Sequence, residues 1–390
     1  MVLLHLVRWL RDNTTHECHL LLLRGGPLEP DFARAATVVR SRAFGLVQDT
    51  AALRARVDRL HPRLKIVRRT AGPLGLAERV TRVLAQRGLR GRAQYDLVYC
   101  NTASCGAALD AMAPGCPVIT HIHELEYALQ MMRVSFAKTK GRTAFYIAAS
   151  HAVRRNLVEN HGIAPGAIGV VHEFVDTTEV LAGPGNRDQI RLSLGLSAEA
   201  LLVGGCGPLE WRKGTDLFTQ VARAAVNLAP DAPLHFVWIG GAPDGAYREE
   251  LLFDLAKWGL TGRVHFVPEV QDPAPWLAAL DVFALPSRED PFPLVCLESA
   301  AQGVPIVCFA DAGGVPEFVE TDCGLVTPYG DTAAMAVAVV RLVQDKVLRC
   351  SLGENAQHKV RARHDIAVAA PQILTLIERV AKFNEPGVRP

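Results

Sequence analysis

Short apolar runs that alternate with amphipathic segments are the feature that most constrains the fold of this chain. In the second half, six runs rich in Val, Ile, Leu and Phe each have the length of a strand. They are LLVGGCG at 201–207, LHFVWIGG at 234–241, VHFVPEV at 264–270, DVFALPS at 281–287, VPIVCFA at 304–310 and CGLVTP at 323–328. Strands that are apolar on both faces and separated by helices form a parallel sheet covered on both sides. We therefore predict a doubly wound, Rossmann-like α/β domain over 189–360.

The first half repeats this pattern, which predicts a second doubly wound domain over residues 1–172. Its expected strands are CHLLLLRGG at 18–26, YDLVYCN at 95–101, PVITHIHE at 117–124, AFYIAAS at 144–150 and AIGVVHEF at 167–174. The polar segment between the domains contains Gly and Pro, which suits a linker at 173–188. Helical patterns fill 361–390. We expect them to pack back toward the first domain and to kink or break at Pro371.

Composition narrows the class of protein. A chain of 390 residues exceeds what one hydrophobic core usually organises, and its net charge of +2 argues against a nucleic-acid partner. Nine cysteines without a CxxC pair or zinc spacing indicate reduced thiols. No apolar run approaches the roughly 18 residues of a membrane span, and Arg8 and Arg11 interrupt the apolar start. We expect a soluble, cytoplasmic protein.

The stretch SREDPFPLVCLESAAQGVPIV, at 287–307, contains two carboxylates near the start of an apolar helix. Asp290 falls in the loop after a predicted strand, Pro293 fits the first helical turn, and Glu298 lies within the helix. Carboxylates accept hydrogen bonds from vicinal hydroxyls, so the pair suits a sugar or a ribose. The alternative is that Asp290 caps the helix while Glu298 is solvated on its exposed face. Spacing alone leaves both interpretations open.

The segment GGCGPLEWRKGTDLF, at 204–218, is a second candidate binding element. A predicted strand ends in a Gly-rich turn, and Lys213 stands just before the expected helix. Backbone N–H groups at that helix start, together with Lys213 and Arg212, make a plausible cradle for a diphosphate. The segment is neither a Walker A motif nor a GxGxxG motif.

The segment THIHELEYAL places His121 and His123 at the end of a predicted strand. Two histidines at this spacing could bind a metal, but no third ligand is identifiable nearby. We therefore favour one core histidine and one histidine in a cleft, and no metal site. Ligands of open parallel sheets bind beyond the carboxyl ends of the strands, so we expect the cleft between the two domains.

Several of these motifs resemble those of a known enzyme family. SREDPFPLVCLESAAQGVPIV, RKGTDLF, ASHAVRRNL, EFVD and HIHE are similar to motifs of the retaining nucleotide-sugar glycosyltransferases of family 4, which have the GT-B fold. The resemblance spans essentially the whole chain and is densest from Leu201 to Pro328. The family carries an acidic residue, seven intervening positions and a Glu, and here the first of these is Asp290 rather than the usual Glu.

The resemblance implies a function and a role for individual residues. The chain would transfer a sugar, without a metal or cofactor, from a nucleoside diphosphate sugar to a hydroxyl acceptor, which could be a saccharide, a lipid-linked molecule or a small molecule. Glu298 would bind the ribose, Asp290 the transferred sugar and Lys213 the diphosphate, while His123 would face the sugar from the other domain. The implied donor-binding residues are Gly207, Arg212, Lys213, Pro268, Glu269, Asp290, Pro291, Phe292, Pro293, Leu294 and Glu298.

The chain departs from the family pattern at two places. Gly207 stands where members carry an Arg about six residues before the Lys, and Arg212 is the expected substitute. Members also begin with a strand and a Gly-rich turn before an amphipathic helix, whereas VLLHLVRWLRDNT is already that helix. Its expected apolar side is Val2, Leu3, Leu6, Val7, Trp9 and Leu10. We therefore expect the first strand to be missing, through a mis-assigned start or a truncation.

A basic segment runs from Arg54 to Arg92, with twelve Arg or Lys against two acidic residues. Such a segment could dock on anionic headgroups at about 1 kcal/mol per cation, which would place the protein at the inner face of the membrane. It lacks the large aromatic residues of an interfacial helix, so we favour a solvated helical face.

Three other functions are compatible with this sequence pattern or with a related α/β fold. A non-catalytic donor-binding or scaffold protein, or a truncated enzyme, would keep the same fold. A phosphorylase would keep the fold and use inorganic phosphate. A nicotinamide-dependent oxidoreductase is disfavoured because the GxGxxG motif is incomplete. The sequence leaves open the donor, the acceptor and the oligomeric state.

Overall fold

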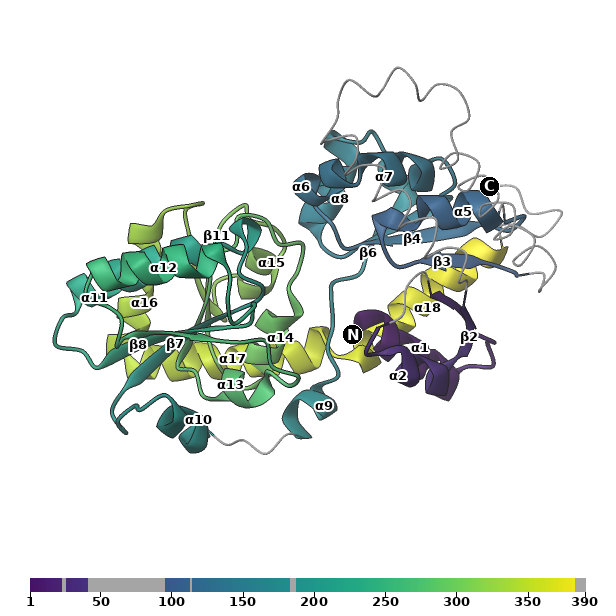
Figure 1. The fold of residues 1–390 in the computed structure, drawn as a ribbon. Coiled ribbons are helices and arrows are strands. Elements are labelled where there is room, and N and C mark those ends of the chain that lie inside the picture. The colour runs from purple at the N-terminus through teal and green to yellow at the C-terminus, as the bar shows by residue number, and fades with distance from the viewer. Residues whose placement is uncertain (23–25, 41–94, 113, 183–186, 383–390) are drawn as a thin grey trace, which may run out of the picture. The chain divides into compact units, whose positions relative to one another are not determined.

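Six parallel strands form the larger sheet of the protein, seen in a computed structural model that describes all residues except 23–25, 41–94, 113, 183–186 and 383–390 (Figure 1). The strand order is β12-β11-β10-β7-β8-β9. The strands are β7 (Leu201–Cys206), β8 (Leu234–Ile239), β9 (Val264–Val267), β10 (Val282–Leu285), β11 (Ile306–Phe309) and β12 (Gly324–Thr327). Each lies within one of the six runs predicted for the second half.

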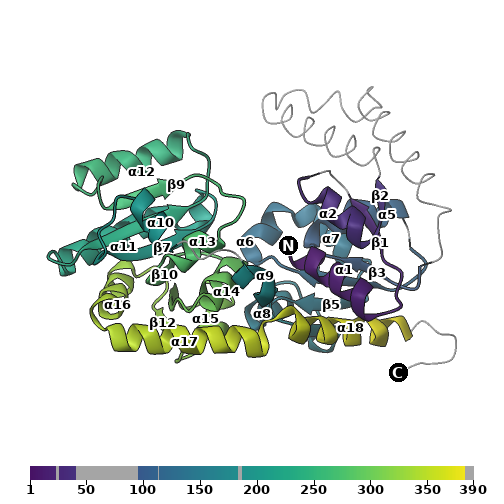
Figure 2. The ribbon, with the colours of Figure 1, turned by 90° about the horizontal axis from the view of Figure 1, so that it is seen from below.

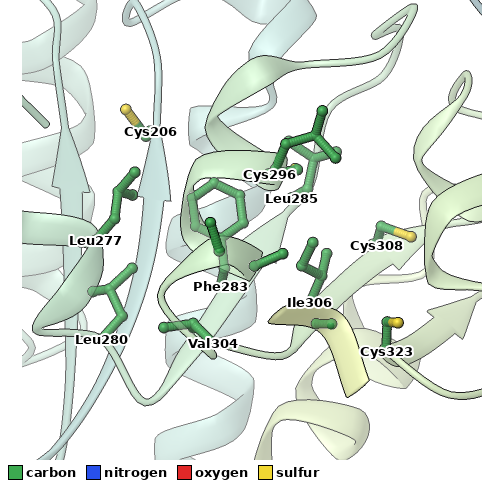
Figure 3. Packing of buried hydrophobic residues seen from close by; sticks show 14 of the residues in the cluster. Cys206, Leu277, Leu280, Phe283, Leu285, Cys296, Val304, Ile306, Cys308 and Cys323 are labelled. Atoms are coloured by element: carbon green, nitrogen blue, oxygen red, sulfur yellow. The ribbon is translucent and has the colours of Figure 1, made fainter. Parts of the chain in front are cut away.

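Both faces of this sheet are buried, because alternate residues of each strand point to opposite faces. On one face, Phe283 and Ile306 belong to a core that also takes residues from four of the helices after β9 (Figure 3). On the other face, Val282 and Val307 pack with residues of a different set of helices. The doubly wound prediction is therefore confirmed.

The helices that follow these strands lie along both faces of the sheet (Figure 2). They are α11 (Thr215–Leu228), α12 (Ala246–Lys257), α13 (Ala274–Ala278), α14 (Leu294–Ala301), α15 (Val315–Val319), α16 (Thr332–Gln344) and α17 (Lys346–Arg363). A short 3-10 helix, η4 (Trp211–Lys213), follows β7.

A second sheet has the strand order β3-β4-β5-β6, and β1 and β2 form a separate parallel pair. The strands are β1 (His19–Leu22), β2 (Thr37–Arg40), β3 (Val98–Cys100), β4 (Val118–Ile122), β5 (Phe145–Ala148) and β6 (Ile168–Val170). All but β2 lie in predicted runs. The remaining elements of the first half are α1 (Val2–Asn13), α2 (Glu29–Ala35), η2 (Ala103–Cys105), α5 (Gly106–Met112), α6 (Glu126–Met131), α7 (Arg133–Lys140), α8 (His151–Glu159) and η3 (Pro165–Ala167).

The first residues form a helix, as the sequence predicts. Helix α1 buries Leu4 and Val7 against Phe32 and Ala35 of α2. Val2, Leu6 and Leu10 are also buried, so the apolar side is close to the predicted one. It differs in that Leu4 is buried, whereas Leu3 and Trp9 are only half-buried.

The structure adds elements to the regions expected to connect or end the domains. Helix α9 (Thr177–Ala182) lies inside the expected linker, and α10 (Arg187–Ser193) follows it. The expected break at Pro371 is wrong, because α18 (Ile366–Lys382) continues through this residue. A proline removes only one backbone donor, and here the buried side chains of Ala370 and Ile373 support the helix around it.

By its internal contacts the chain divides into two compact units. Unit 1 contains residues 1–122, 129–146 and 374–390, and unit 2 contains 123–128 and 147–373. Among the described residues, no helix is long and apolar enough to cross a membrane. All nine cysteines fall in the described part and none forms a disulfide. The basic segment at 54–92 lies outside the described residues.

Candidate functional site

Asp290 is buried in the loop after β10 and is held by several hydrogen bonds. Its Oδ2 accepts from Lys213 Nζ at 2.6 Å and from Ser287 Oγ at 3.2 Å. Its backbone N–H donates to the carbonyl of Ala312 at 2.7 Å. Helix α14 begins at Leu294 with no side-chain cap. The alternative in which Asp290 caps this helix is therefore wrong.

Lys213 is placed by the turn between β7 and α11. Gly214 adopts φ = 70°, and a Cβ atom there would lie 2.0 Å from the carbonyl oxygen of Pro286. Only glycine fits this approach, which brings η4 against the end of β10. The Lys213 side chain, 12% exposed, thereby places its ammonium group against Asp290, 77 residues away in the chain.

Arg212 lies beside the same carboxylate. Its Nη1 donates to the backbone carbonyl of Glu289 at 3.0 Å and is 4.0 Å from Asp290 Oδ1. Its Nη2 pairs with Glu210 at 3.0 Å. Two cations therefore converge on Asp290. The first helical N–H groups of α14 follow in the chain without a side-chain cap, which favours binding of an anion.

Glu298 is half-buried on α14, and one of its carboxyl oxygens is shielded from solvent. Its Oε2 atom is buried and has no hydrogen-bond partner among the described residues. Burial, together with the charge of Asp272, raises the pKa of this carboxyl to about 7. The interpretation of Glu298 as a solvated surface residue is therefore wrong. An orphaned buried carboxyl in a fold that satisfies most of its polar groups suggests a missing hydrogen-bond donor, such as a ligand hydroxyl.

The loops expected to hold a base lie at the same sheet edge. Gly240, after β8, donates its N–H to the carbonyl of Val267 at the end of β9, at 2.9 Å. Glu269 donates its N–H to the carbonyl of Gly241 at 3.1 Å. Pro268 and Glu269 are both exposed, so they can reach a ligand that lies over the carboxyl ends of β8 and β9.

Gly207 occupies the space next to the lysine stem. Its φ is 145°, and a Cβ atom there would lie 3.3 Å from Cδ of Lys213. Its carbonyl accepts the indole N–H of Trp238 at 2.9 Å. No side chain at this position supplies a second cation, so Arg212 is the cation beside Lys213.

The four residues after Asp290 offer backbone rather than side chains. The Phe292 ring is buried and stacks on His364 at 5.4 Å between centroids, with His172 at 5.3 Å. Pro293 is the N-cap of α14 with an extended ψ of 128°, not a residue of its first turn. Pro291 and Leu294 flank these two positions and are partly exposed.

His123 is paired with a carboxylate that the sequence analysis did not single out. Nδ1 of His123 hydrogen-bonds to Oε1 of Glu173, a buried residue in the EFVD segment. Burial lowers the pKa of His123, but the charge and hydrogen bond of Glu173 and the charge of Glu124 outweigh it, so the pKa is raised. The signal in the sequence is an acidic residue beside His172 in a run whose other residues are apolar or Gly.

The two histidines of the HIHE segment have different surroundings. His121 is fully buried in β4, with Nδ1 2.6 Å from the hydroxyl of Tyr99. It is the core histidine of the predicted pair. The expectation that no third ligand-type side chain lies near the two histidines is wrong, because His121, His123 and Glu173 offer atoms within 4.8 Å of one another. The residues Asp290, Lys213, Glu298 and His123 all belong to unit 2.

A second cluster has ligand-type side chains but a different role. His151, His172 and Glu317 offer atoms within 4.8 Å of one another. However, the Glu317 carboxylate accepts backbone N–H groups of His151 at 2.9 Å and Ala152 at 2.8 Å, and His172 Nε2 lies 2.8 Å from it. These bonds satisfy the first N–H groups of α8 and hold the pKa of Glu317 below its usual range against the opposing effect of burial.

Comparison with known proteins supports the family suggested by the motifs. Residues 1–179 match the model of Glycosyltransferase Family 4, and residues 200–345 match that of Glycosyl transferases group 1. The chain belongs to the family 4 glycosyltransferases. The GT-B fold is shared by solved structures of Anabaena HepE in complex with UDP and glucose, at a TM-score of 0.74 and 21% identity over 97% of this chain and 95% of that one.

Curated relatives of this family 4 chain act on different molecules. The lipopolysaccharide core biosynthesis mannosyltransferase LpsB of Rhizobium meliloti is 29% identical over 247 residues, 63% of this chain and 65% of the relative. D-inositol 3-phosphate glycosyltransferase 1 of Catenulispora acidiphila is 28% identical over 284 residues, 67% of this chain and 66% of the relative. The chain thus spans slightly less than two thirds of the length of either relative.

Proposed function

We propose that this family 4 protein is a retaining glycosyltransferase that moves a sugar from a nucleoside diphosphate to a hydroxyl group of a saccharide acceptor. The proposal rests on the pairing of Lys213 with buried Asp290 at the carboxyl edge of the larger sheet. Helix α14, which follows Asp290 in the chain, carries Glu298, whose Oε2 has no hydrogen-bond partner among the described residues. The structures of HepE with UDP and with UDP-glucose support a nucleoside diphosphate sugar as donor. The mannosyltransferase LpsB supports transfer of a hexose.

Each group has a part in donor binding. Ribose hydroxyls would donate to Oε2 of Glu298, which is buried and has no hydrogen-bond partner among the described residues. Asp290 would accept from hydroxyls of the transferred sugar. The diphosphate would lie near the positive charges of Lys213 and Arg212 and near the start of α14, which has no side-chain cap.

In the proposed reaction, the protein mainly stabilises the negative charge that develops on the departing diphosphate, rather than acting as a general acid or base. The bond between the anomeric carbon and the diphosphate oxygen breaks, and that oxygen takes the electron pair. The acceptor hydroxyl attacks from the same face, forms the new glycosidic bond and gives its proton to the departing diphosphate. Lys213 and Arg212 stabilise the charge on the leaving group. His123, oriented by Glu173, would face the sugar. We expect transfer without an added divalent cation, also in the presence of EDTA.

Calorimetric titration with UDP, GDP and ADP tests the donor site. We expect one nucleotide to bind, and Glu298→Gln to weaken binding by roughly tenfold, as for loss of a hydrogen bond to a charged group. Asp290→Asn should instead reduce turnover, with a smaller effect on nucleotide affinity. Glu199→Gln, a change of an exposed carboxylate, is the matched control. If none of the three nucleotides bound detectably, the proposal would be contradicted. Equal and negligible effects of Glu298→Gln and Asp290→Asn would contradict it as well.

The stereochemistry and the rival activities need a second measurement. NMR of the product formed with the nucleotide sugar that binds should show the anomeric configuration of the donor. Inversion would contradict the retaining mechanism. Phosphorolysis with inorganic phosphate and no nucleotide would indicate the phosphorylase instead.

A further inference from the structure

A cavity of about 330 Å³ lies in unit 2, apart from the donor-type residues described above. Its lining comes from α8, from the loops that follow β10, β11 and β12, from η4 and from the start of α6. The volume is at the lower end of small-ligand pockets. Lys213, Asp290 and Glu298 do not line it.

The cavity and the donor-type residues occupy neighbouring parts of one sheet edge. In the order β12-β11-β10-β7-β8-β9, the base loops follow β8 and β9, whereas Tyr329, Asp311 and Glu289 of the cavity follow β12, β11 and β10. Asp290 connects the two parts, because its N–H donates to the carbonyl of Ala312, a lining residue, at 2.7 Å. A hydroxyl group in the cavity would therefore lie beside the loop that holds Asp290.

Polar groups without partners line the cavity. Asn156 is 8% exposed, and its Nδ2 has no hydrogen-bond partner in the part of the chain that the structure describes. Arg155 and Asp311 are exposed, and neither forms an ion pair or side-chain hydrogen bond with another described residue. Asp311 also has φ = 56°, an unusual conformation for a residue other than glycine. The cavity thus offers both donors and acceptors to a ligand.

Three aromatic side chains border the same space. Tyr127, Trp211 and Tyr329 are 46%, 53% and 53% exposed, and all line the cavity. The Trp211 ring is held in place by the Arg288 guanidinium, 4.9 Å from its centroid, and by Tyr127 at 5.4 Å. Rigid amphipathic rings of this kind give contact area to the C–H faces of a ligand and leave its polar edge to hydrogen bonds.

We propose that this cavity is the acceptor subsite and that it binds an uncharged pyranose ring of a saccharide, an inference that rests on the proposed function. Hydroxyl groups both donate and accept, which matches the free amide N–H groups of Asn156, the free guanidinium of Arg155 and the free carboxylate of Asp311. Three carboxylates line the cavity, those of Glu126, Glu289 and Asp311, against the two guanidinium groups of Arg155 and Arg288. Because Arg288 is already paired with Asp216, a phosphorylated or carboxylated ring would meet an excess of negative charge. A lipid tail would leave the buried amide of Asn156 without a partner.

Saturation-transfer NMR on the full chain with the bound nucleotide tests the subsite. The probes are the methyl α-pyranosides of mannose, glucose and galactose at millimolar concentration. We expect saturation transfer to at least one of them, and Asn156→Ala and Tyr329→Ala each to weaken its binding by roughly 2- to 10-fold. Arg155→Ala should act in the same direction. The matched controls are Arg154→Ala, on the same helix outside the cavity, and Phe253→Ala, an exposed aromatic on α12.

The outcomes separate the subsite from the proposed function. Nucleotide affinity unchanged in all five variants, with pyranoside binding weakened only in the three cavity variants, would support the subsite. Nucleotide binding without saturation transfer to any pyranoside, or with transfer that the cavity variants leave unchanged, would overturn the subsite and leave the donor site standing. No binding of any nucleotide would overturn the proposed function and the acceptor role with it.

Discussion

Two carboxylates show how local surroundings set the state of a residue. Asp290 is buried but paired with Lys213, so its charge is compensated. Glu298 is half-buried, its Oε2 atom is buried without a hydrogen-bond partner among the described residues, and its pKa is raised to about 7. Burial of an uncompensated carboxyl costs stability once it ionises. We therefore expect Glu298 to favour nucleotide binding while its ionised form lowers the free energy of unfolding.

Glu298→Gln should stabilise the protein at high pH. The folded-state pKa of about 7 exceeds the ordinary value of 4.5, so between these values the folded state holds more protons than the unfolded state. The wild-type free energy of unfolding should therefore fall as pH rises through this window, by about 3 kcal/mol at most. Gln does not titrate and should remove this loss. Denaturant unfolding at about pH 5 and about pH 8 measures the difference.

The stability difference between wild type and Glu298→Gln must be larger at about pH 8 than at about pH 5 if ionisation of Glu298 causes it. Glu199→Gln replaces an exposed carboxylate and should change stability little at either pH. A gain of equal size for Glu298→Gln at both pH values would point to packing rather than ionisation.

Glu173→Gln should lower the pKa of His123. The substitution keeps the size of the side chain but removes the negative charge that raises the pKa of this imidazole against the effect of burial. We expect the His123 resonance in an NMR titration to shift its midpoint to lower pH, and the pH profile of turnover to shift the same way, while nucleotide affinity stays unchanged. Glu159→Gln, an exposed position on α8, is the control. An unmoved titration midpoint would show that Glu173 only supports the fold.

At the scale of elements, close backbone approaches determine where the loops lie. The loop after β10 and the turn after β11 meet through the Asp290 N–H and a β-bridge between Asp290 and Gly313. Gly313 has φ = 142°, and a Cβ atom there would lie 1.7 Å from the carbonyl oxygen of Asp290. Glycine is thus required by both conformation and space.

Gly313→Ala should displace the Asp290 loop and abolish transfer. The clash with backbone cannot be relieved by a side-chain rotation, so we expect a loss of about 3 kcal/mol or more in the free energy of unfolding. Gly259→Ala is the matched control, because Gly259 also has a positive φ of 71° but no atom lies within 4 Å of the position that a Cβ would take there. It should lose only about 1–2 kcal/mol and keep its activity. Denaturant unfolding and transfer assays on both variants make the comparison, and equal effects would contradict it.

At the scale of the whole molecule, much of the architecture follows from chain order and apolar periodicity. The six strands of the larger sheet fall in the predicted runs, since strands buried on both faces must be continuously apolar. The positions of Lys213 and Asp290 after two such strands also follow, since both lie at the carboxyl edge of one parallel sheet. The sequence did not predict β2 or α9, and it wrongly predicted a break at Pro371. In each case the packing of the folded chain decides the local structure.

The sequence by itself determined the parallel-sheet fold, the family and the chain positions of the donor-type residues, because these depend on local pattern and motif. Only the tertiary structure decided that Oε2 of Glu298 is buried without a partner and that Glu173 reaches His123 from 50 residues away. It also decided that Asn156, whose Nδ2 has no partner among the described residues, lines the same cavity as Asp311. These facts depend on long-range packing, which sets the burial and the partners of a side chain independently of its neighbours in sequence. Charge state, hydrogen bonding and cavity shape are therefore properties of the folded chain.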